Sequence, residues 1–138
     1  MTPKEYLSQA FRLDRSITSK LSQLDSLKAL ATRATSGLSG MPGSDSPDPH
    51  RFEATLVKIA DLEREIDGEI DRLVDLKREI KAVINSVADQ EHRTLLELRY
   101  QCFMTWEQIA VTMNYSIRNV YRTHGNALKS IQIPQSWQ

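Results

Sequence analysis

Apolar residues follow a helical spacing along most of the chain. In the first segment they recur every three or four positions, so they form one stripe along a helix. These positions are Leu7, Ala10, Leu13, Ile17, Leu21, Leu24, Leu27 and Ala31. Thr2 can cap such a helix, Pro3 suits its first position, and Glu5 can reach back to the cap. The pattern predicts one long N-terminal helix within residues 1–35.

A second apolar stripe follows a heptad repeat, which is typical of a coiled coil. One heptad position is held by Ile59, Ile66, Leu73, Ile80 and Val87, and the other by Leu62, Leu76 and Val83. Glu69 interrupts the first series, and we expect the neighbouring Ile70 to take its apolar role. The pattern predicts a second long coiled-coil helix over residues 51–88.

The segment between these helices, residues 36–50, is rich in glycine, proline and serine and holds no aromatic residue. Such a composition predicts a flexible loop, long enough to reverse the chain. The two helices would then form an antiparallel hairpin. Two helices alone bury little surface, so a third element or a second subunit should cover the stripe. The pattern leaves open whether the helices pair within one chain or between chains.

The C-terminal region, residues 89–138, contains shorter helical patterns. A helix capped by Asp89 is expected to end near residue 100, and two more follow, separated by residues 114–116. No segment alternates with the period of a strand, so the predicted fold is all-α. The last two helices would form a helix-turn-helix, with Ala110 at the crossing and Val120 inside the second helix.

Caps support both of those helices. Thr105 is followed three residues later by Gln108, the spacing of a capping box, and Ser116 can cap the following helix. Between them, Asn114 tolerates the left-handed backbone that such turns use. The second helix can enter the major groove of duplex DNA, which is wide enough for one helix.

These residues carry a resemblance to a known family. Residues 95–131 resemble region 4 of bacterial sigma-70-type factors, through LLELRY at 95–100, TWEQIAVTMN at 105–114 and NALKSI at 126–131. In its layout the whole chain is similar to small phage and prophage proteins of Gram-positive bacteria, several of which regulate late-gene transcription. The resemblance implies a DNA-binding transcription regulator in the bacterial host cytoplasm. Its coiled coil would mediate self-association, as a dimer, or contact with host RNA polymerase.

Helix geometry assigns the candidate contacts to double-stranded DNA. Backbone N–H groups near Thr105 and Gln108 can hold a phosphate. The remaining candidates lie at the start or on the exposed side of the recognition helix: Ser116, Ile117, Arg118, Asn119, Tyr121 and Arg122. This helix carries less charge than the sigma pattern does, so the sigma promoter element does not transfer to it.

Charge sets a limit on the proposed binding. The chain holds 18 basic and 18 acidic residues. Residues 105–131 have three basic residues and one acidic one, a net charge of +2, so a monomer would bind DNA weakly. A dimer or a polymerase bound alongside would strengthen binding by engaging two sites at once.

Other chemistry finds little support in the sequence. The single cysteine, Cys102, excludes a disulfide framework and is expected to be a small buried residue. The three histidines lack the spacing of metal ligands, and no nucleophile or phosphate-binding loop has a recognisable motif. We therefore expect no enzyme activity, no metal and no cofactor. No apolar run has the length of a membrane span, so no membrane partner is expected.

Two alternative functions remain open at this point. Small terminase subunits of phages also join a helix-turn-helix to helical oligomerisation segments, although usually with the DNA unit toward the N-terminus. A coiled-coil adaptor that never contacts DNA is the second alternative.

Overall fold

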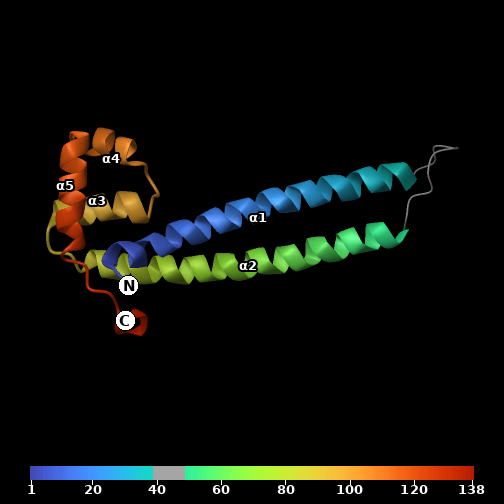
Figure 1. Cartoon of the computed structure of the whole chain (residues 1–138), viewed down its shortest axis with the longest axis horizontal. Coiled ribbons are helices and arrows are strands. Elements are labelled where there is room, and N and C mark those ends of the chain that lie inside the picture. Colours follow the sequence, from blue (N-terminus) through green and yellow to red (C-terminus); the bar gives the residue numbers. More distant parts are fainter. Residues whose placement is uncertain (39–48) are drawn as a thin grey trace. The chain divides into compact units, whose positions relative to one another are not determined.

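The computed structural model describes residues 1–38 and 49–138, and in these ranges the regular elements are helices without any strand (Figure 1). The predicted all-α fold is therefore confirmed. The elements are α1 (Pro3–Leu38), α2 (Pro49–Asn85), α3 (Gln90–Tyr100), α4 (Trp106–Met113), α5 (Ile117–Leu128) and a short 3-10 helix, η1 (Gln135–Trp137).

The ends of the long helices differ from the predicted bounds. Helix α1 continues to Leu38, because a single glycine costs only about 1 kcal/mol in a helix and does not stop it. Helix α2 begins at Pro49 and ends at Asn85. There the N–H groups of Ser86 and Val87 donate to carbonyls three residues back, which tightens and closes the last turn. The rest of the predicted flexible loop, residues 39–48, lies outside the described residues.

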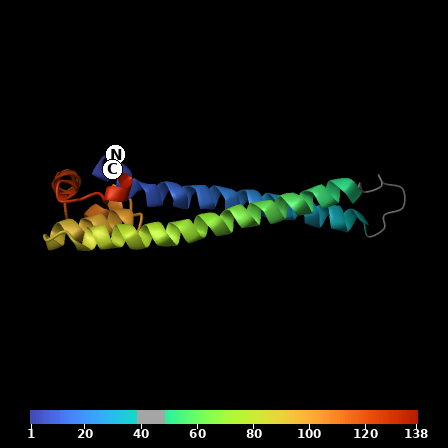
Figure 2. The same cartoon turned by 90° about the horizontal axis from the view of Figure 1, so that it is seen from below.

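The chain divides into two compact units. The C-terminal unit combines Met1–Asp14 with Arg72–Gln138, and the hairpin unit is Arg15–Asp71. The expected boundary at residue 88 therefore does not coincide with a boundary between units. Each unit contains part of both long helices. Within the hairpin unit, α1 and α2 run side by side in opposite directions (Figures 1 and 2).

In the hairpin unit, α1 and α2 pair through polar contacts as well as apolar ones. Glu69 accepts hydrogen bonds from Ser16 Oγ, at 3.1 Å, and from Lys20 Nζ, at 2.6 Å. The expectation that Ile70 replaces Glu69 in the apolar stripe is wrong, because Ile70 remains 40% exposed. Glu69 itself faces α1, where a cation and a hydroxyl compensate its carboxylate.

Further ion pairs fix the antiparallel register of this unit. Lys20 also lies 3.6 Å from Glu65, and Lys28 lies 3.8 Å from Glu63. Later residues of α1 thus meet earlier residues of α2, as an antiparallel pair requires. The apolar side chains that are buried between them are Ile17, Leu24 and Ile66.

In the C-terminal unit a third layer covers the helix pair. A core cluster joins the first turns of α1, the end of α2, α3 and the end of α5. Its buried members are Tyr6, Leu7, Ala10, Leu76, Ile80, Ile84, Val87, Leu96, Tyr100, Ala127 and Ile131. Here the apolar stripe is covered by other elements of the same chain, as one of the two sequence-based alternatives required.

The C-terminal tail is anchored on the same unit. Glu79 Oε1 accepts hydrogen bonds from the Trp137 indole, at 2.7 Å, and from the Tyr6 hydroxyl, at 3.0 Å. The rings of Tyr6 and Trp137 pack edge to face, 6.0 Å apart. Burial, reinforced by the bond to Glu79, raises the pKa of the Tyr6 hydroxyl, which keeps its proton.

Candidate nucleic-acid interface

Helix α4 begins with the capping box that its sequence predicts. Thr105 Oγ1 accepts a hydrogen bond from Gln108 N–H at 3.2 Å, and Gln108 Oε1 accepts one from Thr105 N–H at 2.9 Å. The reciprocal bonds satisfy two backbone donors that the helix start would leave unpaired. The two candidate residues are therefore engaged with each other, and both are exposed.

A three-residue turn then sets the angle between α4 and α5. Asn114 adopts the left-handed conformation, with φ 57° and ψ 45°, as its side chain permits. Tyr115 N–H donates to the Ala110 carbonyl at 2.9 Å. Ser116 Oγ accepts a hydrogen bond from Asn119 N–H at 3.1 Å and caps α5. The turn is thus fixed from both sides.

A small core holds the last three helices together. Leu95 of α3, Ile109 of α4 and Val120 of α5 are fully buried against one another. Partly buried residues close the cluster, among them Ala110 and Met113. The inward residues predicted for the two-helix unit therefore lie inward, and the opposite side of α5 is left facing solvent.

The remaining candidate residues divide into two groups by exposure. Arg118, Arg122 and Ser116 are exposed, as are the larger side chains Ile117 (41%) and Tyr121 (51%). Asn119 is only partly exposed, and its Oδ1 accepts a hydrogen bond from Arg122 at 2.7 Å. In the free chain this amide is thus engaged within α5 rather than aimed outward.

Tyr121 lies at the border between the exposed side and the core. Its ring packs edge to face on Trp106, with centroids 5.5 Å apart. The Arg99 guanidinium also lies over Trp106, 4.2 Å from the ring centroid. The aromatic contact holds the phenol at the edge of the exposed surface.

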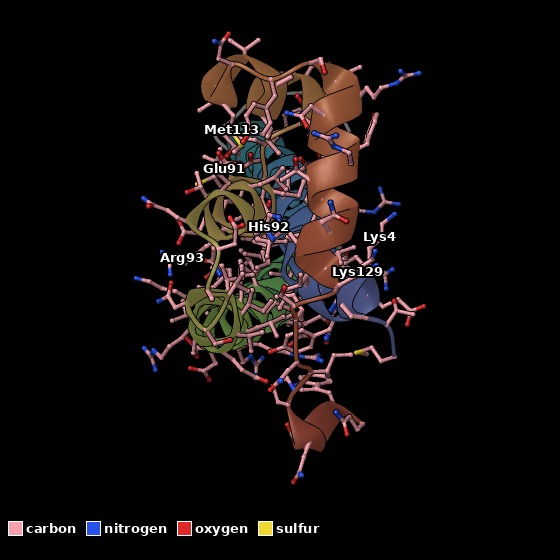
Figure 3. All side chains as sticks on the ribbon, turned by 90° about the vertical axis from the view of Figure 1, so that its left-hand side faces the viewer. Lys4, Glu91, His92, Arg93, Met113 and Lys129 are labelled. Atoms are coloured by element: carbon pink, nitrogen blue, oxygen red, sulfur yellow. The ribbon has the colours of Figure 1, made fainter. Side chains whose placement is uncertain are left out.

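The surface of α5 is basic. Residues 108–138 contain no acidic residue, whereas Arg118, Arg122 and Lys129 follow one another at helical spacing on its outward side. We call these three the basic face. In Figure 3, Lys4 of α1 and Lys129 are on the same flank of α5, while Glu91 and Arg93 lie on the opposite flank.

Behind the basic face lies a buried pair that sequence reasoning missed. His124 is 7% exposed, its Nε2 lies 2.7 Å from the Tyr100 hydroxyl, and its ring packs on Trp106 at 4.6 Å. Burial, with smaller contributions from Lys4 and Arg99, lowers the pKa of His124 to about 4. The imidazole is therefore neutral at pH 7.

The protonation of its partner completes the assignment. Burial raises the pKa of Tyr100 to about 12, so the hydroxyl keeps its proton and can donate to the neutral Nε2. The apolar spacing could have placed His124 inward, because it lies four residues after Val120 and three before Ala127. The residue type, rather than the spacing, concealed it.

One further expectation concerns the segment before α4. Cys102 is exposed, so its predicted burial is wrong. It follows the end of α3 and precedes Phe103, which has a positive φ of 57° and packs against the core cluster. Cys102 lines an open hollow of about 610 Å³ together with Met104, Glu107, Gln108, Val111 and Thr112.

Within the described residues, no three side chains suited to a metal ion lie together.

A comparison with protein families now places the chain. The family model described as a protein of unknown function, DUF722, matches residues 54–132, which is more than half of the sequence. The chain belongs to the DUF722 family. In this DUF722 protein the match runs from α2 through α5, so the proposed interface lies inside it. No curated protein and no solved structure shows a significant match to the chain.

The described helices of this DUF722 protein were also compared with the length and apolarity that a bilayer demands. None of them meets both requirements for crossing a membrane.

Proposed function

We propose that this DUF722 protein is a sequence-specific DNA-binding transcription regulator of phage or prophage type. Helices α4 and α5 act as its helix-turn-helix, and α5 enters the major groove of duplex DNA. Thr105 and Gln108, at the start of α4, lie where backbone N–H groups meet a phosphate. The protein works in the cytoplasm of the bacterial host.

One observation carries this proposal. The side of α5 that faces away from the core presents Arg118 and Arg122 with the exposed Ile117 and Tyr121, and residues 108–138 contain no acidic side chain. Arginine can pair with a guanine edge or a phosphate, and an exposed isoleucine can contact a thymine methyl group. A helix that only packs against its neighbours has no need of this combination on its outer side.

The size of the basic face sets the expected affinity. Neutralising about three phosphates gives a slope near −2.7 for the logarithm of affinity against the logarithm of salt concentration. Such binding is weak for one copy. Self-association through the coiled coil, as a dimer, or simultaneous contact with RNA polymerase raises the effective concentration of the second contact.

Selection from a pool of random duplex DNA tests the function. The full chain is incubated with the pool at about 50 mM salt, and the retained duplexes are sequenced. The proposal predicts an enriched motif, whose symmetry reports half-site spacing if the protein is a dimer. The matched variant Arg118→Ala/Arg122→Ala should give no enrichment while keeping its helical content. Equal enrichment by both proteins would contradict the assignment of these residues, and no enrichment by the native chain would contradict the function.

A function as an adaptor that contacts only proteins has one observation in its favour. The hairpin unit leaves apolar side chains in solvent, among them Leu56, Val57 and Ile70, each at least 40% exposed. Exposed apolar residues on a helix are frequent at protein contacts. If an adaptor role is the whole function, substituting Arg118 and Arg122 should leave every interaction of the protein unchanged.

A further inference from the structure

Gly125 lies on the outward side of α5, at the beginning of its last turn. The basic face follows the spacing of four, three and four residues through Arg118, Arg122, Gly125 and Lys129, so the glycine continues the same line on the helix surface. It is exposed, with Arg122 about one turn before it and Lys129 about one turn after it. The line of cations therefore has a gap in its centre.

Among the described residues, no contact requires a glycine at this position. A Cβ atom built on Gly125 would meet no atom within 4 Å apart from its own neighbours in the helix, and the backbone there is helical with no positive φ. Glycine is nevertheless among the least favourable residues in a helix interior. The cost in helix stability therefore has no compensation within the free protein.

Close approach by a ligand supplies the missing reason. Because glycine has no Cβ, another molecule can come nearer to the helix backbone at a glycine than at any other residue. The cations on both sides fit a polyanion, whereas a neutral or basic partner would leave them without a counter-charge.

We propose that Gly125 is the point of closest approach between α5 and the sugar–phosphate backbone of duplex DNA. This inference rests on the proposed function and refines it. The first half of α5, with Ile117, Arg118 and Tyr121, faces the base edges. The second half, with Gly125 between Arg122 and Lys129, lies against the strand that borders the groove.

A second helical glycine provides the matched control. Gly68 lies inside α2 and likewise has no atom within 4 Å of a built Cβ. Its neighbours one turn away carry both signs of charge: Arg64, Glu65, Asp71 and Arg72. Such a surface does not attract a polyanion. The two glycines should therefore respond alike in stability and differently in DNA binding.

The test compares Gly125→Ala, Gly125→Leu and Gly68→Ala in the full chain. Each is measured for melting temperature and for affinity to a labelled duplex recovered from the random pool, with a mixed-sequence duplex at about 50 mM salt as the second probe. Alanine at either position should raise the melting temperature by about 2 to 4 °C, because it removes a helix-breaking residue. Affinity should fall about five- to tenfold for Gly125→Ala, further for Gly125→Leu, and not at all for Gly68→Ala.

The outcomes separate this inference from the proposed function. If Gly125→Ala and Gly125→Leu bind DNA as the native chain does, while Arg118→Ala/Arg122→Ala does not bind, the close approach is refuted and the function stands. If the native chain binds neither duplex, both fail. A lower melting temperature for Gly125→Ala would also overturn the inference, because the glycine would then serve the fold itself.

Discussion

Different interactions stabilise the two units of this chain. Among the described residues, 17 apolar side chains are buried, of which 14 belong to the C-terminal unit and three, Ile17, Leu24 and Ile66, to the hairpin unit. The C-terminal unit is stabilised by burial of a core that several helices share. The hairpin unit buries fewer apolar side chains, and ion pairs and hydrogen bonds also join its two helices.

The contrast extends to the surfaces of the units. In the hairpin unit, lysines of α1 meet glutamates of α2, so charges of one sign find partners within the unit. In the C-terminal unit, α5 carries a basic face with no acidic residue after Glu107. Lysines of the hairpin unit therefore form ion pairs within that unit, whereas the basic face of α5 remains available to a partner. This difference is the physical basis for placing the DNA contact on α5.

The largest expected effect is the loss of a core side chain from the C-terminal unit. Ile109→Ala removes a fully buried residue between α3 and α5 and should cost about 2 to 4 kcal/mol of unfolding free energy. Leu24→Ala should cost about 1 to 2 kcal/mol, because only one other helix surrounds Leu24 and solvent can relax around it. Urea unfolding measures both. Equal costs would contradict the difference in how the units are held together.

The next effect is a loss of stability in acid that originates in the C-terminal unit. The folded pKa of His124, about 4, lies below its ordinary value of about 6.5, so the unfolded chain binds a proton more readily. Its contribution is complete above pH 6.5 and declines as the pH falls to 4, by about 2 to 3 kcal/mol. His124→Gln retains an acceptor for Tyr100 without titrating. The native chain and this variant should therefore diverge in melting temperature over that range, and parallel curves would refute the assignment.

The same buried pair shows how far the sequence reaches. Periodicity predicted the all-α fold, the positions of the five helices and the inward residue Val120, because burial imposes a regular spacing on the sequence itself. The caps Thr105 and Ser116 were predictable for a similar reason, since they act within three residues. The contact between Tyr100 and His124 spans 24 residues, and no local pattern encodes it.

Glu69 marks the other limit of prediction. From the sequence alone, a carboxylate in a heptad position looks like an interruption of the apolar stripe. Its partners Ser16 and Lys20 cannot be recognised, because they lie more than 45 residues away in the sequence. Helical spacing predicted which side of α5 faces solvent. It could not predict the hydrogen bond between Arg122 and Asn119 or the open space around Gly125.

A smaller effect concerns the polar pair in the hairpin unit. Lys20→Met alone should cost about 1 kcal/mol, because it removes the cation that lies 2.6 Å from the partly buried carboxylate of Glu69. The double variant Lys20→Met/Glu69→Leu should be as stable as the native chain or more stable, since an apolar pair avoids desolvation of two charges. Unfolding in urea tests this comparison. A double variant less stable than the native chain would contradict this expectation and show that the ion pair itself stabilises the unit.

The smallest effect distinguishes the lysines of the two units by their response to salt. Lys129→Ala should lower the salt slope of DNA binding by about 0.9, the value of one phosphate contact. Lys28→Ala, in the hairpin unit, should leave the slope unchanged, because Lys28 pairs with Glu63. Fluorescence anisotropy titrations at several salt concentrations measure both. Equal slopes for the two variants would contradict a contact at Lys129.

The most direct test of the central claim is the change in amide chemical shifts when duplex DNA is added to the isotope-labelled full chain. The account predicts that the largest shifts follow the outward side of α5 from Ser116 to Lys129 and the start of α4 at Thr105 and Gln108. The chemical shifts of the amides in the hairpin unit should not change. Shifts concentrated in the hairpin unit, or none anywhere at concentrations that saturate weak binding, would contradict the claim that α5 binds DNA.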